Sequence, residues 1–181
     1  MFRVSATIGL AAVLALPPLA LAQQATPPAP AWAQGRPDSM AASPPPLVRP
    51  PDAFTFAETV NTFCYQAHWI AKKLRRGELA VAHECLDGYA RMLLRTLIRW
   101  HAERAGDTWH KSRFMEEWAD AVVIDRIPDT YALHTRQDIF RALGAMMDLV
   151  GWLTREIAAT YGFVVPEAEE RAVRELVAAL A

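Results

Sequence analysis

The chain has 181 residues and carries 19 Lys and Arg against 20 Asp and Glu, a net charge of −1. A nucleic-acid-binding domain usually has a basic surplus, so this balance argues against nucleic acid as the partner. The length leaves room for one ordinary domain and some additional chain.

Residues 1–22 have the layout of a secretory signal peptide. Arg3 precedes an apolar run, and the segment closes with "ALA" at 20–22, a typical cleavage pattern. The unbroken apolar run before Pro17 is shorter than the roughly 20 residues that span a bilayer, so a membrane anchor fits less well. We expect a mature chain that begins near Gln23, is periplasmic or secreted, and has no membrane contact after cleavage. A mistaken start codon is the alternative.

Residues 23–51 are rich in Pro and Ala. Of the 13 prolines in the chain, 11 lie at or before Pro51. Because proline fixes φ and lacks a backbone donor, and because this stretch has little apolar content to bury, we predict a disordered, extended linker. A plain spacer is favoured over a ligand for a proline-binding partner.

Residues 52–181 should form one domain with a single core. This region carries 16 Lys and Arg against 19 Asp and Glu, a net charge of −3, with the charges interspersed. Apolar residues recur at steps of three and four, which predicts α-helices. The first apolar stripe consists of Phe56, Val60, Phe63, Ala67, Ile70 and Leu74. A basic last turn and Gly77 end this helix.

A second helix should follow at once and pack antiparallel to the first, because the turn at Gly77 is short. Its predicted stripe consists of Leu79, Ala82, Leu86, Tyr89, Leu93, Leu97 and Trp100. A turn is predicted at 106–108, and a short helix is indicated by Phe114, Met115 and Trp118. Pro128 should begin another brief turn.

The motif "TRQD" at 135–138 is typical of a capping box and predicts the start of a third long helix. The stripe of this helix consists of Ile139, Leu143, Met146, Val150, Leu153 and Ile157, before Gly162. Pro166 opens the last helix, whose predicted stripe is Ala172, Val173, Leu176 and Leu180. No strand pattern competes. The predicted fold is all-α, an antiparallel helical bundle of about five to six helices.

The two cysteines are Cys64 and Cys85. An exported protein meets an oxidising compartment, which permits a disulfide. The turn near Gly77 leaves the two positions about four residues out of level, which favours buried free thiols. Both alternatives stay open.

The domain has no recognisable catalytic motif. It has no glycine-rich phosphate loop and no D-x-D or E-x-D pair to hold Mg²⁺ for phosphoryl or nucleotidyl transfer. The histidines at 68, 83, 101, 110 and 134 show no i, i+4 pair, so no metal site is predicted.

The best candidate for a binding site is the stretch "RWHAERAGDTWHKSRFMEEWAD" at 99–120. Flat aromatic rings beside carboxylates and imidazoles suit a polar, cationic ligand. The predicted substrate-binding residues are Trp109, His110, His101, Asp107 and Trp100. The alternative is a corner of the core, since Trp100 and Trp118 lie on apolar stripes, whereas Trp109 lies at a turn and is expected to be partly exposed.

From about Phe54 to Leu180 the chain resembles the C-terminal helical domain of the aminoglycoside 6-adenylyltransferases, the streptomycin adenylyltransferase family. The stretches that carry the resemblance are "WIAKKLRRGELAVAHECLD", "LIRWH", "DTWHKSRFMEEWAD", "DTYALHTRQDIFRALGAMMDLVGWLTREIAATYGF" and "VPEAEERAVREL". They follow one another in the same order as in that domain.

The resemblance implies a helical domain that closes over an N-terminal nucleotidyltransferase domain, with the aminoglycoside in the cleft between them. ATP and magnesium belong to the nucleotidyltransferase domain, and no positions in this sequence match their sites. We therefore assign no catalytic residue and expect no cofactor in this chain, which should be inactive alone.

Three functions remain open. The first is an exported, non-catalytic module that binds an aminoglycoside or another cationic small molecule. The second is a fragment or subunit of an ATP-dependent aminoglycoside nucleotidyltransferase, with its catalytic domain on another chain or lost by truncation. The third is an interaction domain that docks a protein partner at the face left by the missing domain.

Overall fold

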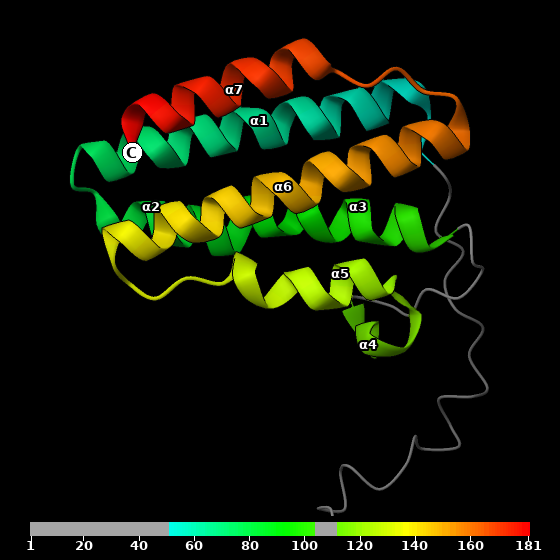
Figure 1. The fold of residues 1–181 in the computed structure, drawn as a ribbon, viewed down its shortest axis with the longest axis horizontal. Helices are drawn as coiled ribbons and strands as arrows, with labels where there is room; N and C mark the ends of the chain where they lie inside the picture. The colour runs from blue at the N-terminus through cyan, green and yellow to red at the C-terminus, as the bar shows by residue number, and fades with distance from the viewer. Residues whose placement is uncertain (1–50, 104–111) are drawn as a thin grey trace, which may run out of the picture. The chain divides into compact units, whose positions relative to one another are not determined.

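The computed structural model describes residues 51–103 and 112–181, and every regular element in these ranges is a helix (Figure 1). The all-α prediction is therefore confirmed. The predicted signal peptide and almost all of the predicted linker lie outside the described residues. Within the described ranges, no helix combines the length and the apolar character needed to cross a bilayer.

Four long helical segments build the bundle. Helix α1 pairs with the continuous helix that follows it, α6 lies beside α3, and α7 packs along α1 (Figure 1). The elements in chain order are α1 (Ala53–Arg75), α2 (Leu79–Cys85), the π-helix η3 (Leu86–Ala90), α3 (Arg91–Glu103), α4 (Met115–Trp118), α5 (Ala121–Arg126), the 3₁₀ helix η5 (Ile127–Thr130), α6 (Arg136–Tyr161) and α7 (Glu167–Leu180).

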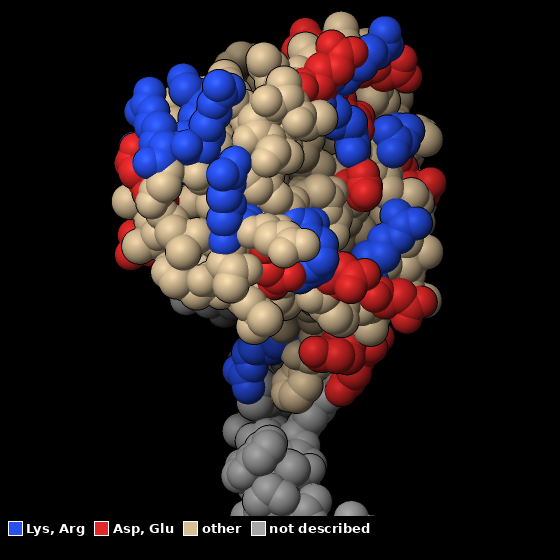
Figure 2. All heavy atoms as spheres, turned by 60° about the vertical axis from the view of Figure 1, so that its left-hand side comes forward, with Lys and Arg blue, Asp and Glu red and all other residues tan. Residues whose placement is uncertain are grey.

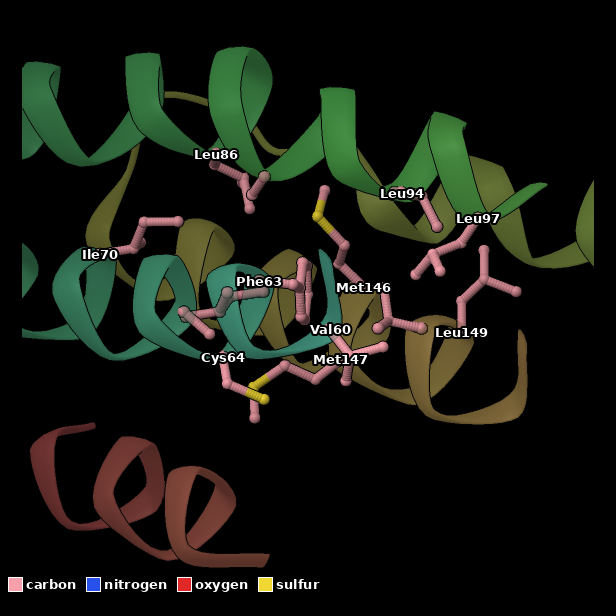
Figure 3. Packing of buried hydrophobic residues seen from close by; sticks show 14 of the residues in the cluster. Val60, Phe63, Cys64, Ile70, Leu86, Leu94, Leu97, Met146, Met147 and Leu149 are labelled. Carbon is pink, nitrogen blue, oxygen red and sulfur yellow. The ribbon is translucent and has the colours of Figure 1, made fainter. Parts of the chain in front are cut away.

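The core lies between α1, α3 and α6. All predicted stripe residues of α1 and α6 are buried. Figure 3 shows how Val60 and Phe63 of α1 lie close to Met146 of α6 in the interior of the bundle. Each large apolar side chain that is fully buried in this way stabilises the fold by roughly 1.5–3 kcal/mol.

The helix ends follow local chemistry. The Asp52 carboxylate accepts a hydrogen bond from the Thr55 backbone N–H at 2.7 Å and caps α1. Gly77 and Gly162 take positive φ angles of 78° and 72°, which a glycine adopts without strain. Both predicted helix ends are confirmed.

The predicted capping box at α6 is confirmed in part. The Thr135 hydroxyl accepts from the Asp138 N–H at 3.3 Å, as a cap should. The Asp138 carboxylate accepts from the Leu133 N–H at 2.6 Å instead of reaching back to the Thr135 N–H. The acid therefore holds the preceding loop, because the Thr135 N–H already donates to the Leu133 carbonyl at 2.7 Å.

The predicted stripe of the second helix is wrong at Tyr89 and only partly confirmed at Leu93. Tyr89 is exposed and Leu93 is only half-buried, whereas the next residues, Ala90 and Leu94, are completely buried. The π-helix η3 explains the shift, because a π-turn inserts one extra residue into the helical repeat. In the turns next to η3 the buried residues lie one position later than predicted, at Ala90 and Leu94, whereas Leu97 and Trp100 are buried as predicted.

The predicted stripe of α7 is also wrong in part. Ala172 and Leu176 face solvent, and the side that packs on the bundle carries Val173 and Val177. Arg174 orients α7 in this way through two contacts with α6. Its guanidinium forms a salt bridge with Asp148 and donates a hydrogen bond to the Met147 carbonyl.

The region between α3 and α6 contains a helix that the sequence pattern did not indicate. The Asp120 side chain caps α5 by accepting from the Val122 N–H at 2.9 Å. Val123 is the buried contact of this short helix. The indicated helix near Met115 and the turn that starts at Pro128 are confirmed as α4 and η5.

Candidate functional site

An open groove lies between α1 and the helix that follows it, with a volume of about 370 Å³. We call it the aromatic groove. Its lining residues are Tyr65, Gln66 and Trp69 from α1, and Val81, Glu84, Cys85 and Tyr89 from α2 and η3. Tyr65 and Trp69 are four residues apart and therefore lie one above the other on the same face of α1.

The π-helix places the third ring of the groove. A regular helix would direct Tyr89 toward the core, as the sequence pattern predicted. The extra residue in η3 turns Tyr89 outward, so that it is 64% exposed, comparable to Tyr65 at 61%. π-turns are often found at functional sites, and here one supplies an aromatic wall.

The floor of the aromatic groove is neutral. The Cys85 thiol donates a hydrogen bond to the Gln66 side-chain oxygen at 3.0 Å. Burial raises the pKa of the Cys85 thiol, so this group stays protonated at neutral pH. Gln66 lines the groove, and its amide nitrogen carries two further N–H donors.

Glu84 is the carboxylate of the groove. It is exposed and forms no ion pair or hydrogen bond with any other described residue. The Lys73 ammonium lies over the Trp69 ring, 4.7 Å from its centroid, and pairs with Glu78. The free negative charge of the groove therefore sits beside aromatic rings, which suits a ligand with a cationic group.

The surface charge at the end of the bundle that contains the last turn of α1 is divided. Figure 2 turns this end toward the viewer and shows a cluster of Lys and Arg side chains on one side, with acidic and basic side chains intermixed over the other. The last turn of α1 contributes Lys72, Lys73 and Arg75. A cationic ligand is therefore favoured at Glu84 and disfavoured beside that turn.

Two of the five predicted binding residues belong to the described part of the chain. Trp100 and His101 belong to α3 and are 8% and 3% exposed, so the alternative of a core position is confirmed for Trp100. Trp109, His110 and Asp107 lie outside the described residues. Neither Trp100 nor His101 lines the aromatic groove, and the binding role of all five residues stays a prediction.

His101 is linked to the surface through Trp152. The two rings pack with their centroids 4.9 Å apart. Trp152 lines a second pocket of about 520 Å³, together with Arg126, Asp129, Ala145, Asp148, Arg155 and Arg174. The Asp148 carboxylate is already paired with Arg174 at 2.6 Å. This pocket therefore offers a cationic ligand less free negative charge than the aromatic groove.

Both cysteines are free and buried, so of the two alternatives the free thiols are confirmed. Burial, followed by the charges of Glu170 and Glu169, raises the pKa of Cys64 to about 11. Since the thiolate is the reactive form, neither cysteine has the character of a nucleophile.

The sequence contained a signal for the aromatic groove that the stripe analysis passed over. Tyr65 and Trp69 lie at i, i+4 spacing off the apolar stripe of α1, which puts two aromatic residues on one face outside that stripe. Tyr89 gave no such signal, because only the π-helix moves it out of the core.

Two comparisons with known proteins indicate the family and the fold of the chain. The streptomycin adenylyltransferase family model matches residues 39–180. The crystal structure of an aminoglycoside 6-adenyltransferase from Bacillus subtilis matches with a TM-score of 0.67 and 18% sequence identity, over 74% of this chain and 52% of that chain. At this identity the structural match supports the fold alone.

A comparison with curated proteins gives no match. The chain spans about half the length of the solved relative. The matched region covers the whole helical bundle, in agreement with the resemblance seen in the sequence. This chain belongs to the streptomycin adenylyltransferase family.

Proposed function

We propose that this chain is an exported, non-catalytic binding module whose aromatic groove holds a cationic, sugar-like molecule such as an aminoglycoside. The observation that supports this most directly is the free Glu84 carboxylate beside the rings of Tyr65, Trp69 and Tyr89. Guanidinium and ammonium groups pair with carboxylates and stack on aromatic faces. Streptomycin carries guanidinium groups on a polyhydroxylated ring and matches this chemistry.

The family's magnesium ion does not fit the described residues. Adenylyl transfer needs carboxylates that converge on the metal bound to ATP. Within 51–103 and 112–181, no group of three or more His, Cys, Asp or Glu side chains is arranged to hold a metal ion. We therefore derive no transfer step from these residues and assign them a binding role.

Titration of the purified protein with streptomycin is expected to release heat and to quench tryptophan fluorescence. Trp69→Leu and Glu84→Gln should each weaken binding about tenfold or more, because each removes a contact to the cation. Glu175→Gln, on the exposed side of α7, is the matched charge control and should leave binding unchanged.

A Trp109→Leu variant separates the two candidate sites. If the aromatic groove holds the ligand, this variant should bind like the unmodified protein. Loss of binding in Trp109→Leu, with Trp69→Leu unaffected, would move the site to the predicted residues around Trp109. Absence of heat at millimolar streptomycin would reject a binding module for this ligand.

The second candidate is a subunit of an aminoglycoside nucleotidyltransferase completed by another chain. Its support is the family match together with the half-length coverage of the solved relative. On the binding-module proposal, the pure chain mixed with ATP, Mg²⁺ and streptomycin should release no pyrophosphate. Release by the chain alone would contradict that proposal, and release only after addition of a separate nucleotidyltransferase domain would favour the second candidate.

A further inference from the structure

Two histidines that are far apart in sequence meet at one end of the bundle. His83 belongs to α2, and His134 lies directly before α6. Their Nδ1 atoms are 3.1 Å apart, and their ring centroids are 5.1 Å apart. Neither residue lines the aromatic groove, and the proposed function uses neither.

The other ring nitrogen of His83 fixes its tautomer. His83 Nε2 lies 3.1 Å from the Ala132 carbonyl oxygen and 3.4 Å from an oxygen of Asp87. Both neighbours only accept hydrogen bonds, so Nε2 carries the proton and donates it. His83 Nδ1 therefore keeps its lone pair and directs it toward His134.

This arrangement is the one that metal-binding histidines show. A metal-bound imidazole usually donates its second N–H to a carboxylate or a backbone carbonyl, which holds the ring and increases its basicity. The outer group is itself held here, since Asp87 also pairs with Arg91 at 2.9 Å. The position of the His83 ring is thus set before any ion arrives.

The spacing of the two nitrogens fits a shared ion. A tetrahedral Zn²⁺ with bonds of about 2.0–2.1 Å places two nitrogen ligands about 3.3 Å apart, close to the observed Nδ1 to Nδ1 distance. Without an ion, His134 Nδ1 donates a hydrogen bond to His83 Nδ1 across the same gap. Binding of an ion would require the other neutral tautomer of His134, with its proton on Nε2 instead of Nδ1.

We propose that His83 and His134 form a two-imidazole site for a divalent transition-metal ion, of the class Zn²⁺, Ni²⁺ or Cu²⁺. Imidazole nitrogens prefer these ions over Mg²⁺ or Ca²⁺. The described residues add no third side-chain ligand, so water completes the coordination. The exposed ring of His134 leaves the site open to solvent.

The ion would join α2 to the loop before α6. These two segments lie 51 positions apart in the chain, so the bound ion crosslinks distant parts of the fold. Because it binds the folded state only, it stabilises the bundle by mass action. The expected rise in Tm is about 3–6 °C when the free ion is tenfold above its Kd.

The test is thermal unfolding of the purified full chain with ZnCl₂, NiCl₂ or excess EDTA. Zn²⁺ and Ni²⁺ should raise Tm, and EDTA should reverse the rise. His83→Gln and His134→Asn should each abolish the response, whereas His68→Asn, a histidine on α1 outside the pair, should retain it. Because His134 is exposed, its variant should fold normally and keep the test valid if His83→Gln does not.

A second measurement reports the ligands directly. One equivalent of Cu²⁺ should give an electron paramagnetic resonance spectrum with coupling to two nitrogens, reduced to one nitrogen or lost in His134→Asn. No change of Tm with any of these ions, or an equal change in His134→Asn, would overturn the proposal. Since streptomycin binding is measured separately, failure here is distinguishable from failure of the proposed function.

Discussion

Replacement of Arg91 by methionine is expected to lower the free energy of unfolding by about 3 kcal/mol. Arg91 is only 4% exposed, although it carries a full charge. Its guanidinium donates to the Thr130 hydroxyl at 2.9 Å and to the Thr130 carbonyl at 2.8 Å, and it pairs with Asp87 at 2.9 Å. It also lies over the Tyr131 ring, 3.8 Å from the centroid.

The loss is large because the partners of Arg91 have no substitute donor. Thr130 is completely buried at the end of η5, so its carbonyl would lose a donor that water does not replace. Arg91 thus fastens η5 to α3, two elements separated in the chain by residues 104–126. The Arg91→Met variant should therefore also loosen the segment between η5 and α6, which carries His134.

Urea unfolding monitored by circular dichroism measures this effect. Arg95→Met, at an exposed position of the same helix, is the matched control and should change stability by less than about 0.5 kcal/mol. Arg91→Lys should be intermediate, because lysine keeps the charge and loses the planar fork of donors. Equal stability of Arg91→Met and Arg95→Met would contradict this interpretation.

Truncation of Leu94 to alanine is expected to cost about 3 kcal/mol, whereas Leu93→Ala should cost about 1 kcal/mol. The two residues are adjacent and chemically identical, so they differ only in the face of α3 on which they lie. Leu94 is completely buried against the core, and Leu93 is half-buried at its edge. The π-helix η3 decides which of them faces inward.

The comparison of these two variants therefore tests the helical register itself. Without the π-turn, the regular repeat from Leu86 would bury Leu93 and expose Leu94, and the order of the two costs would be reversed. Thermal or urea unfolding of both variants under the same conditions gives the answer. A larger loss for Leu93→Ala would show that α3 continues the period of α2 without an inserted residue.

The same register shift connects the fold with the proposed binding site. An uninterrupted helix would bury Tyr89 and leave the aromatic groove with the rings of α1 alone. The shift exposes Tyr89 beside Glu84 and keeps the core filled by Ala90 and Leu94. The core and the groove thus depend on one local departure from α-helical geometry.

The two long helices α1 and α6 were predictable because they are regular. Their apolar residues repeat without interruption, and their ends carry local signals such as Asp52, Gly77 and Gly162. Helix α5 and the packing face of α7 were not predictable in this way. Arg174 orients α7 through contacts to α6, and such a contact between distant segments leaves no periodic trace in the sequence.

The sequence by itself determined the all-α class, the core faces of α1 and α6, and the family, because these depend on spacing and order along the chain. The tertiary structure alone decided the position of Tyr89, the aromatic groove and the meeting of His83 with His134. The physical reason is that neither the π-turn nor a contact across 51 residues follows from the apolar period along one helix. Packing acts between surfaces that are far apart in the chain, whereas a sequence pattern records only neighbours on one helix.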